Sequence, residues 1–291
     1  MNEGVCWLEG EIVPLEQARV PVLDHGFLYG DGVFEGIRFY GGVPFLLVEH
    51  LRRLRDSARA IALDLPWSEA ELAGIVEAVV EAAGREDGYV RLIVTRGEGP
   101  LGIDPASCER PRLIVIASRL EMVDRAARRE GIRLVVAATR RLPPDGLDPR
   151  IKSLNYLNHV LARIEANRAG ADEAVLLNAQ GRVAEGTADN LFVVRDGRLA
   201  TPPVIDGALP GITRALVLQL AGEMGIEVQE QSLAPYDLYT ADELFLTGTG
   251  AELIPVREID GRPLRACPGP LFLRCQQAFR RYIAACCQGA G

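Results

Sequence analysis

The chain has 291 residues, 48% of them hydrophobic and 25% charged, and this ordinary composition excludes a disordered protein. Its formal net charge is −8, which argues against nucleic acid as the main partner, because phosphate binding needs a basic surface. No run approaches the ~18 apolar residues of a membrane span, so we expect no membrane partner.

The first 119 residues show strand and helix patterns. Segments rich in β-branched, aromatic or other apolar residues predict strands over 33–40, 89–95 and 112–117. Apolar residues at helical spacing predict a helix over 48–63. Ser68, with Glu71 three residues later, has the pattern of a capping box and predicts a second helix that ends near Ala83.

A charged segment over 119–131 ends in glycine and predicts a linker between two domains. We therefore expect a small N-terminal domain over 1–119, a linker over 120–131 and a larger domain over 132–291. The larger part has strand patterns over 132–138 and 243–247, helix patterns over 156–169, 212–224 and 270–285, and hairpin turns at Asn178–Gly181 and Asp196–Gly197. The expected fold class is mixed α/β, or α+β, in two domains.

The six cysteines are scattered, without C-x-x-C spacing or neighbouring histidines. We expect free thiols in a reducing compartment, the cytoplasm, rather than disulfides or a zinc site. The first residues lack a basic region followed by an apolar stretch, so we expect no export signal. His25, His50 and His159 share no ligand spacing, and we expect structural roles for them.

Lys152 is the only lysine, and every other basic residue is an arginine. Strong arginine bias in the genome explains the missing lysines, and the plain alternative for the remaining one is chance survival. Arginine cannot replace a lysine that must act as a neutral amine, because a guanidinium group stays protonated. A desolvated lysine can lose its proton and act as a base or form a Schiff base. We therefore hypothesise a chemical role for Lys152.

Three further segments have the residue types of an anion site. Pro210–Arg214 begins a helix, whose free N–H groups and dipole favour an anion. Thr247–Gly250 follows a strand and offers N–H groups and hydroxyls, and His50–Leu54 carries an arginine pair. Each has an ordinary alternative, a glycine turn or a solvated arginine face. Glu185 is either a catalytic carboxylate or a surface residue of a hairpin.

In this order and spacing, the segments resemble the fold-type IV pyridoxal-phosphate enzymes, and among them the branched-chain aminotransferase family. The resemblance extends from about Trp7 to Tyr282. The matching segments are 29–38, 50–54, 152–156, 185–192, 209–214 and 247–252. The family implies a homodimer whose subunits have a small N-terminal and a larger C-terminal domain, with pyridoxal 5'-phosphate in the cleft between them.

The resemblance also implies roles for individual residues. Lys152 would bond the cofactor covalently and move a proton, and Glu185 would pair with the pyridine nitrogen. Arg53, rather than Arg52, has the family's H-x-x-R-L position for the cofactor phosphate. The other expected cofactor contacts are Tyr156, Leu209, Ile212, Thr213, Gly248 and Thr249.

Three subgroups of the family compete, and residues 99–103 distinguish them. The D-amino acid type carries an R-x-H pair that binds the substrate carboxylate, and the matching positions here are Leu101 and Ile103. This apolar pattern resembles the branched-chain type, in which the loop lines the side-chain pocket of the partner subunit; the alternative is ordinary core packing. Arg91 would serve the distal carboxylate of glutamate. The expected substrate-binding residues are Tyr29, Phe34, Arg38, Tyr89, Arg91, Leu101, Ile103 and Gly250.

We therefore expect transamination of L-leucine, L-isoleucine and L-valine with 2-oxoglutarate. A D-amino acid aminotransferase and an aminodeoxychorismate lyase of the same fold are the alternatives. An idle relative kept as a binding protein is the alternative from a different class. Colour distinguishes it, because cofactor bonded to a lysine absorbs visible light and an empty fold does not.

Overall fold

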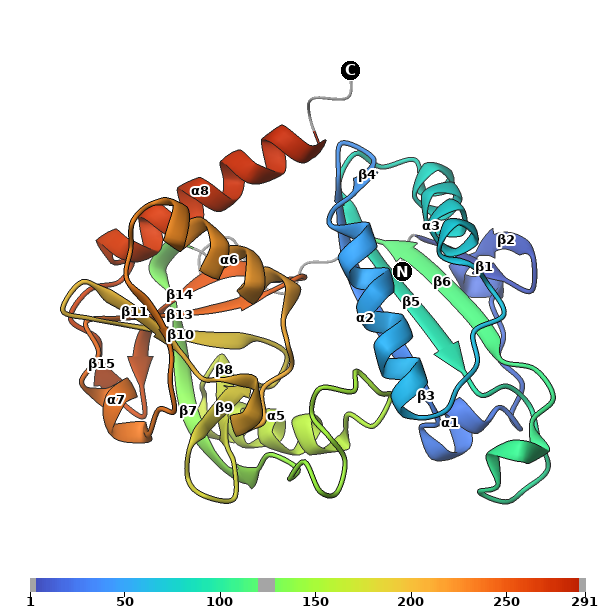
Figure 1. The fold of residues 1–291 in the computed structure, drawn as a ribbon, viewed down its shortest axis with the longest axis horizontal. Helices are drawn as coiled ribbons and strands as arrows, with labels where there is room; N and C mark the ends of the chain where they lie inside the picture. Colours follow the sequence, from blue (N-terminus) through green and yellow to red (C-terminus); the bar gives the residue numbers. More distant parts are fainter. Residues whose placement is uncertain (1–3, 120–128, 288–291) are drawn as a thin grey trace. The chain divides into compact units, whose positions relative to one another are not determined.

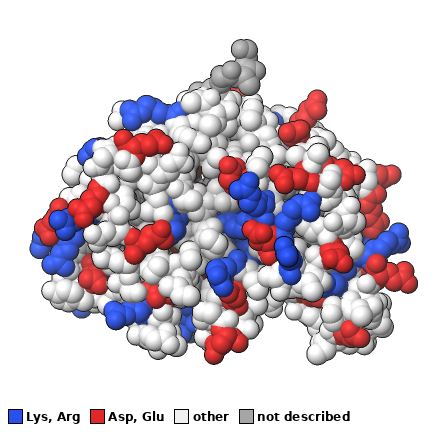
Figure 2. Space-filling model, in the orientation of Figure 1, with Lys and Arg blue, Asp and Glu red and all other residues white. Residues whose placement is uncertain are grey.

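The computed structural model describes residues 4–119 and 129–287. Contacts within the chain divide it into two compact units (Figure 1). Among the described residues, the first unit holds 4–119, Ile151–Asn155 and 283–287, and the second holds 129–150 and 156–282. No helix in these residues is long and apolar enough to cross a membrane. Acidic and basic side chains lie intermixed over the face shown in Figure 2.

The first unit contains a six-stranded antiparallel sheet in the order β2-β1-β6-β5-β3-β4. Its strands are β1 (Gly4–Leu8), β2 (Glu11–Pro14), β3 (Gly32–Tyr40), β4 (Val43–Pro44), β5 (Gly88–Thr95) and β6 (Arg112–Ser118). Its helices are α1 (His25–Tyr29), α2 (Leu47–Ala60) and α3 (Glu69–Ala83), with short 3-10 turns η1 (Leu15–Gln17) and η2 (Pro105–Ser107). The strands expected over 33–40, 89–95 and 112–117 are confirmed as β3, β5 and β6.

Alternation along the strands explains why α2 and α3 cover one face of this sheet. Val90, Leu92 and Val94 of β5 are fully buried and belong to one apolar cluster with Leu54 of α2 and Val76 of α3. Successive side chains of a strand point to opposite faces, so residues two apart share a face. This cluster is the core of the first unit.

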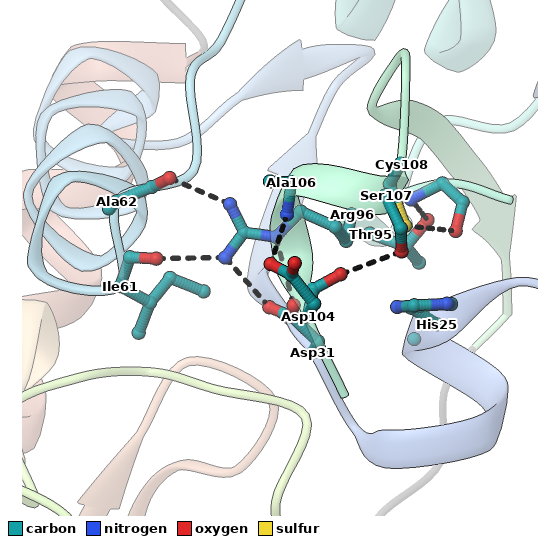
Figure 3. Close-up of polar contacts among 12 residues, drawn as sticks. His25, Asp31, Ile61, Ala62, Thr95, Arg96, Asp104, Ala106, Ser107 and Cys108 are labelled. Atoms are coloured by element: carbon teal, nitrogen blue, oxygen red, sulfur yellow. Dashed lines mark hydrogen bonds and ion pairs between the residues drawn. The ribbon is translucent and has the colours of Figure 1, made fainter. Parts of the chain in front are cut away.

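The two long helices of the first unit follow the sequence prediction to different extents. α3 begins with both hydrogen bonds of the expected capping box, from Glu71 N–H to Ser68 Oγ at 3.2 Å and from Ser68 N–H to the Glu71 carboxylate at 2.7 Å. α2 ends at Ala60 rather than near residue 63. The side chain of Arg96 binds the carbonyls of residues 61 and 62 and the carboxylate of Asp31 (Figure 3). A distant arginine therefore fixes the end of α2.

The second unit contains a nine-stranded mixed sheet in the order β12-β11-β10-β13-β14-β7-β8-β9, with β15 paired to β14. Its strands are β7 (Ile132–Arg140), β8 (Glu173–Leu177), β9 (Val183–Gly186), β10 (Asn190–Arg195), β11 (Arg198–Thr201), β12 (Val228–Glu230), β13 (Glu243–Gly248), β14 (Glu252–Ile259) and β15 (Arg262–Pro263). Its helices are α5 (Leu157–Ala169), α6 (Ile212–Glu223), α7 (Pro235–Tyr239) and most of α8 (Pro270–Cys287), with a 3-10 turn η3 (Val204–Asp206).

Most elements expected in this part of the chain are confirmed. The strands over 132–138 and 243–247 are β7 and β13, and the three helices are α5, α6 and α8. Both hairpins form, as β8–β9 and β10–β11. Asp196 and Gly197 have φ angles of 50° and 72°, as the tight two-residue turn of a hairpin requires.

The segment Ile151–Asn155 groups with the first unit, although it follows the expected linker and lies within the domain expected over 132–291. Backbone hydrogen bonds to β3 explain this: Phe34 N–H donates to Lys152 O at 3.0 Å, and Leu154 N–H donates to Gly32 O at 2.9 Å. Residues 120–128 of the expected linker lie outside the described residues.

Candidate active site

Lys152 lies on the segment Ile151–Asn155 of the first unit, and its N–H and its carbonyl both form hydrogen bonds. Its N–H donates to Ser57 Oγ on α2 at 3.1 Å, and its carbonyl accepts from Phe34 N–H on β3. Its Nζ is 4.7 Å from the centroid of the Phe34 ring, within the range of a cation–π contact. The half-buried amine is therefore presented from a backbone that α2 and β3 hold in place.

Arg53 binds a buried carboxylate of β3. Arg53 Nε donates to Glu35 Oε1 at 2.7 Å, and Arg53 Nη2 donates to Glu35 Oε2 at 2.8 Å. His50 Nδ1 lies 2.7 Å from Glu35 Oε2. His50 and Arg53 are three residues apart on α2, so both side chains lie on the helix face toward β3. The Glu35 and His50 side chains are buried: Glu35 has no exposed area and His50 almost none.

The charges in this cluster follow from burial and from the neighbours. Burial alone would raise the pKa of the Glu35 carboxyl, but Arg53 and His50 outweigh it and hold that pKa at about 2. Burial lowers the pKa of His50 from its ordinary value of 6.5, against the opposing effect of Glu35. At neutral pH, Glu35 is therefore an anion that accepts from Arg53 and from a neutral His50 protonated on Nδ1.

Four of the expected substrate residues lie on β3 and β5. Arg91 lies over the Phe34 ring at 4.6 Å and over the Tyr89 ring at 5.4 Å, and Arg38 lies over the Tyr40 ring at 5.4 Å. Gly36 leaves room for Tyr89, since a Cβ there would be 2.0 Å from the phenol oxygen. Burial raises the pKa of Tyr89, so its hydroxyl stays protonated and can donate.

The loop with Leu101 and Ile103 is ordered by polar contacts, while its apolar side chains face outward. Gly102 N–H donates to the Tyr29 hydroxyl at 2.9 Å. Asp104 caps the following turn, where its side chain accepts from Ala106 N–H and its carbonyl accepts from Ser107 (Figure 3). Leu101 and Ile103 are 77% and 85% exposed, so the alternative of core packing is wrong.

In the second unit, Glu185 is a buried carboxylate with fixed partners. It lies on β9, where every residue is buried. Its Oε2 accepts from Leu209 N–H at 2.8 Å, and its Oε1 is 3.1 Å from Arg141 Nε. Arg141 Nε also lies 3.1 Å from the carbonyl of Gly207. Glu185 is therefore no exposed hairpin residue.

Two backbone segments of the second unit fit an anion. Helix α6 begins after Gly211 without a side-chain cap, so the N–H groups of its first turn, which includes Ile212 and Thr213, point out of the helix. Asn190 Nδ2 donates to Leu209 O at 3.0 Å, and a Cβ on Gly211 would be 1.9 Å from Asn190 Oδ1. The loop before α6 is thus fixed by Asn190.

The second segment is the end of β13 and the turn after it. A Cβ on Gly248 would be 2.0 Å from Asp189 Oδ1, so only glycine permits this approach. Thr249 and Gly250 follow in a turn.

Tyr156 precedes α5 and packs edge-on against His159, with ring centroids 4.3 Å apart.

The expected site residues therefore form two sets. Lys152, Arg53 and the residues of β3 and β5 belong to the first unit, and Tyr156, Glu185 and the residues around α6 and β13 belong to the second. Sequence reasoning missed four polar residues that hold members of these sets: Glu35, Ser57, Arg141 and Asn190. One signal was available for Glu35, a charged residue in the alternating apolar row of β3.

Comparisons with known proteins agree on one family. The model of the family described as amino-transferase class IV matches residues 32–259. A putative branched-chain-amino-acid aminotransferase of Methanocaldococcus jannaschii is 52% identical over 88% of each chain. The crystal structure of the Escherichia coli branched-chain amino acid aminotransferase has a TM-score of 0.93, with 37% identity over 97% of this chain and 95% of that one. A crystal structure of the T.th. branched-chain amino acid aminotransferase complexed with N-(5'-phosphopyridoxyl)-L-glutamate has a TM-score of 0.91, with 37% identity over 98% and 95% of the two chains.

Proposed function

The chain belongs to the class IV aminotransferases, and we propose that it transaminates L-leucine, L-isoleucine and L-valine with 2-oxoglutarate, using pyridoxal 5'-phosphate. The names of the relatives support the substrates, and the solved complex with phosphopyridoxyl-glutamate supports both the cofactor and glutamate as product. The observation that carries the proposal in this chain is the single lysine, bonded through its backbone to α2 and β3.

The residues of this chain fit the aldehyde and the phosphate of the cofactor. Lys152 supplies the amine for its aldehyde, and the ordered guanidinium of Arg53 supplies charge for its phosphate. The uncapped start of α6, with Ile212 and Thr213, offers N–H groups to the same phosphate. The other proposed contacts are Tyr156, Leu209, Gly248 and Thr249. When bound, the cofactor supplies a ring that takes up negative charge from the substrate Cα.

Lys152 and Glu185 then have separate tasks. A neutral Lys152 amine would remove the proton from the substrate Cα and deliver it to the C4′ atom of the cofactor, which a guanidinium group cannot do. Arg141 and the Leu209 N–H both bind the carboxylate of Glu185 and fix its position. An anionic Glu185 can accept a hydrogen bond from a protonated pyridine nitrogen and so keep that nitrogen charged.

The proposed substrate residues suit both the apolar side chain of a branched-chain amino acid and the distal carboxylate of glutamate. Phe34 and Tyr89, with Tyr29, Leu101 and Ile103, supply apolar surface, and burial of a leucine-like side chain is worth roughly 1.5–3 kcal/mol. This corresponds to about tenfold to over a hundredfold preference over alanine. Arg91 supplies charge for the distal carboxylate of glutamate. The Gly250 and Thr249 N–H groups, with the Tyr89 hydroxyl, serve the α-carboxylate, and Arg38 completes the proposed set.

We also propose a homodimer. Four side chains of the first unit are at least 73% exposed although they are large and apolar: Val22, Phe27, Leu101 and Ile103. Hydrogen bonds join the two segments that carry these side chains. Gly99 N–H donates to Leu23 O at 3.3 Å, and Gly102 N–H donates to the Tyr29 hydroxyl. An exposed apolar patch of this kind marks a protein interface.

For the compartment we propose the cytoplasm, with the free thiols of all six cysteines in a reducing environment.

A donor screen tests the proposed function. The purified protein is incubated with pyridoxal 5'-phosphate, 2-oxoglutarate and one donor at a time, and glutamate formation is measured. We expect high kcat/KM with L-leucine, L-isoleucine and L-valine and only weak activity with D-alanine. A higher kcat/KM for D-alanine than for L-leucine would overturn the branched-chain substrates, pyruvate release from aminodeoxychorismate would indicate the lyase, and a colourless protein would indicate an idle relative.

A further inference from the structure

Glu35 occupies a position where a carboxylate is unusual. Along β3 it lies between Val33 and Ile37, both fully buried in the core of the first unit. Residues two apart on a strand share a face, so Glu35 is on the face that α2 covers. Replacing a buried ion pair by apolar side chains is often neutral or stabilising, so stability alone does not explain this residue.

Arg53 is the one side chain that binds both carboxylate oxygens of Glu35. The donors are Arg53 Nε and Nη2, and one of the two oxygens also binds His50. Such a bidentate pair fixes the plane of the guanidinium as well as its position. Because the partner strand β5 pairs with β3 from Gly32 to Phe39, the backbone under Glu35 has a fixed register.

We propose that Glu35 is a positioning residue, which holds the Arg53 guanidinium in the orientation that binds the cofactor phosphate. This inference rests on the proposed function, in which Arg53 serves that phosphate. An arginine side chain that is already ordered loses less entropy when it binds than a mobile one does. Glu35 itself touches neither cofactor nor substrate in this proposal and acts through Arg53.

The charge of Glu35 and its hydrogen-bond geometry predict opposite effects of a Glu35→Gln substitution on phosphate affinity. The proposal is testable for this reason. If Glu35 only offset the charge of Arg53, Glu35→Gln would raise the affinity for a phosphate dianion. If Glu35 orients Arg53, Glu35→Gln lowers that affinity, because an amide accepts at only one of its two polar atoms. Glu35→Asp keeps the charge but shortens the side chain, so it also lowers the affinity if the orientation matters.

The experiment is a spectroscopic titration of the full-length protein, freed of cofactor, with pyridoxal 5'-phosphate and with pyridoxal. We expect Glu35→Gln and Glu35→Asp to weaken pyridoxal 5'-phosphate binding by about tenfold, and pyridoxal binding by less than about twofold. In an Arg53→Lys background, which lacks the bidentate pair, Glu35→Gln should change the affinity by less than about twofold. The thermal midpoint of each variant shows that it is folded.

Asp31→Asn is the matched control. Asp31 forms a second bidentate pair in the same unit, with Arg96 Nε at 2.9 Å and Nη2 at 3.0 Å (Figure 3). We expect it to keep the parent affinity for both ligands. Equal losses for pyridoxal and its phosphate, a gain in Glu35→Gln, or no change in either Glu35 variant would overturn the inference. A parent protein that does not prefer the phosphorylated ligand would overturn both the inference and the proposed role of Arg53.

Discussion

The N–H and the carbonyl of Lys152 bind Ser57 and Phe34, and these two backbone hydrogen bonds do not depend on which side chain stands at position 152. Lys152→Arg keeps a positive charge but removes the amine that can be neutral. We expect kcat to fall by at least about a hundredfold, the scale of a lost general base. Steady-state assays with L-leucine and 2-oxoglutarate measure this. Arg150→Ala, which changes an exposed neighbour, is the control and should keep the parent rate; residual activity of Lys152→Arg within tenfold would contradict the role.

Glu35 also links stability to acid pH. Its pKa in the folded protein is about 2, against an ordinary value of 4.5, so it stabilises the fold above pH 4.5 and loses this contribution as the pH falls toward 2. The full loss is about 3 kcal/mol. The lowered pKa of His50 acts in the same direction, but its contribution is lost from pH 6.5 downward.

Urea unfolding at several pH values between 7 and 2.5 separates these contributions. We expect the free energy of unfolding of Glu35→Gln to fall less steeply than that of the parent below pH 4.5, because the variant has no carboxyl to protonate there. His50→Gln should instead flatten the profile from pH 6.5 downward. Parallel profiles for the parent and Glu35→Gln would show that this carboxyl is not the one with the lowered pKa.

At the scale of elements, one face of α2 carries two of the contacts that organise the first unit. Arg53 binds Glu35, and Ser57, four residues later, accepts the backbone N–H of Lys152. Positions four apart on a helix lie on the same face. The segment with Lys152 is therefore aligned by the same helix that carries the proposed phosphate ligand.

Ser57→Ala removes this acceptor and leaves the Lys152 N–H without it. We expect a loss of stability of about 1–3 kcal/mol and a fall in kcat of about threefold or more, with KM little changed. Thermal unfolding and steady-state kinetics measure the two effects. The control is Ser68→Ala at the N-terminus of α3, which should cost about 1 kcal/mol of stability with an unchanged kcat. If both variants had the same kcat, the alignment of Lys152 by Ser57 would be unimportant.

At the scale of the whole molecule, the exposed apolar patch of the first unit predicts self-association. Phe27→Asp places a charge on that patch, and we expect it to shift the protein from dimer to monomer in sedimentation experiments. Ile205→Asp is the matched control, because Ile205 is 72% exposed but lies on the second unit. A parent protein that is monomeric, or equal association of the two variants, would contradict the proposed interface.

The sequence by itself determined those features that depend on neighbouring residues. Runs of β-branched, aromatic and other apolar residues identified β3, β5 and β6, a spacing of three residues identified the capping box of α3, and turn residues identified the hairpins. A single lysine among arginines pointed to one residue for amine chemistry. These signals are local because helix periods, strand alternation and turns are set by short segments of backbone.

Only the tertiary structure decided how distant residues combine. Strand β14 contains Pro255, which weakens its strand pattern, and it forms because β13 and β7 pair with it on both sides. Likewise, the segment with Lys152 groups with the first unit through its bonds to β3 and α2, and Glu35 meets Arg53 only because α2 packs on β3. These contacts join residues many positions apart, and the free energy that selects them comes from burial and hydrogen bonding in the folded chain, which no local pattern contains.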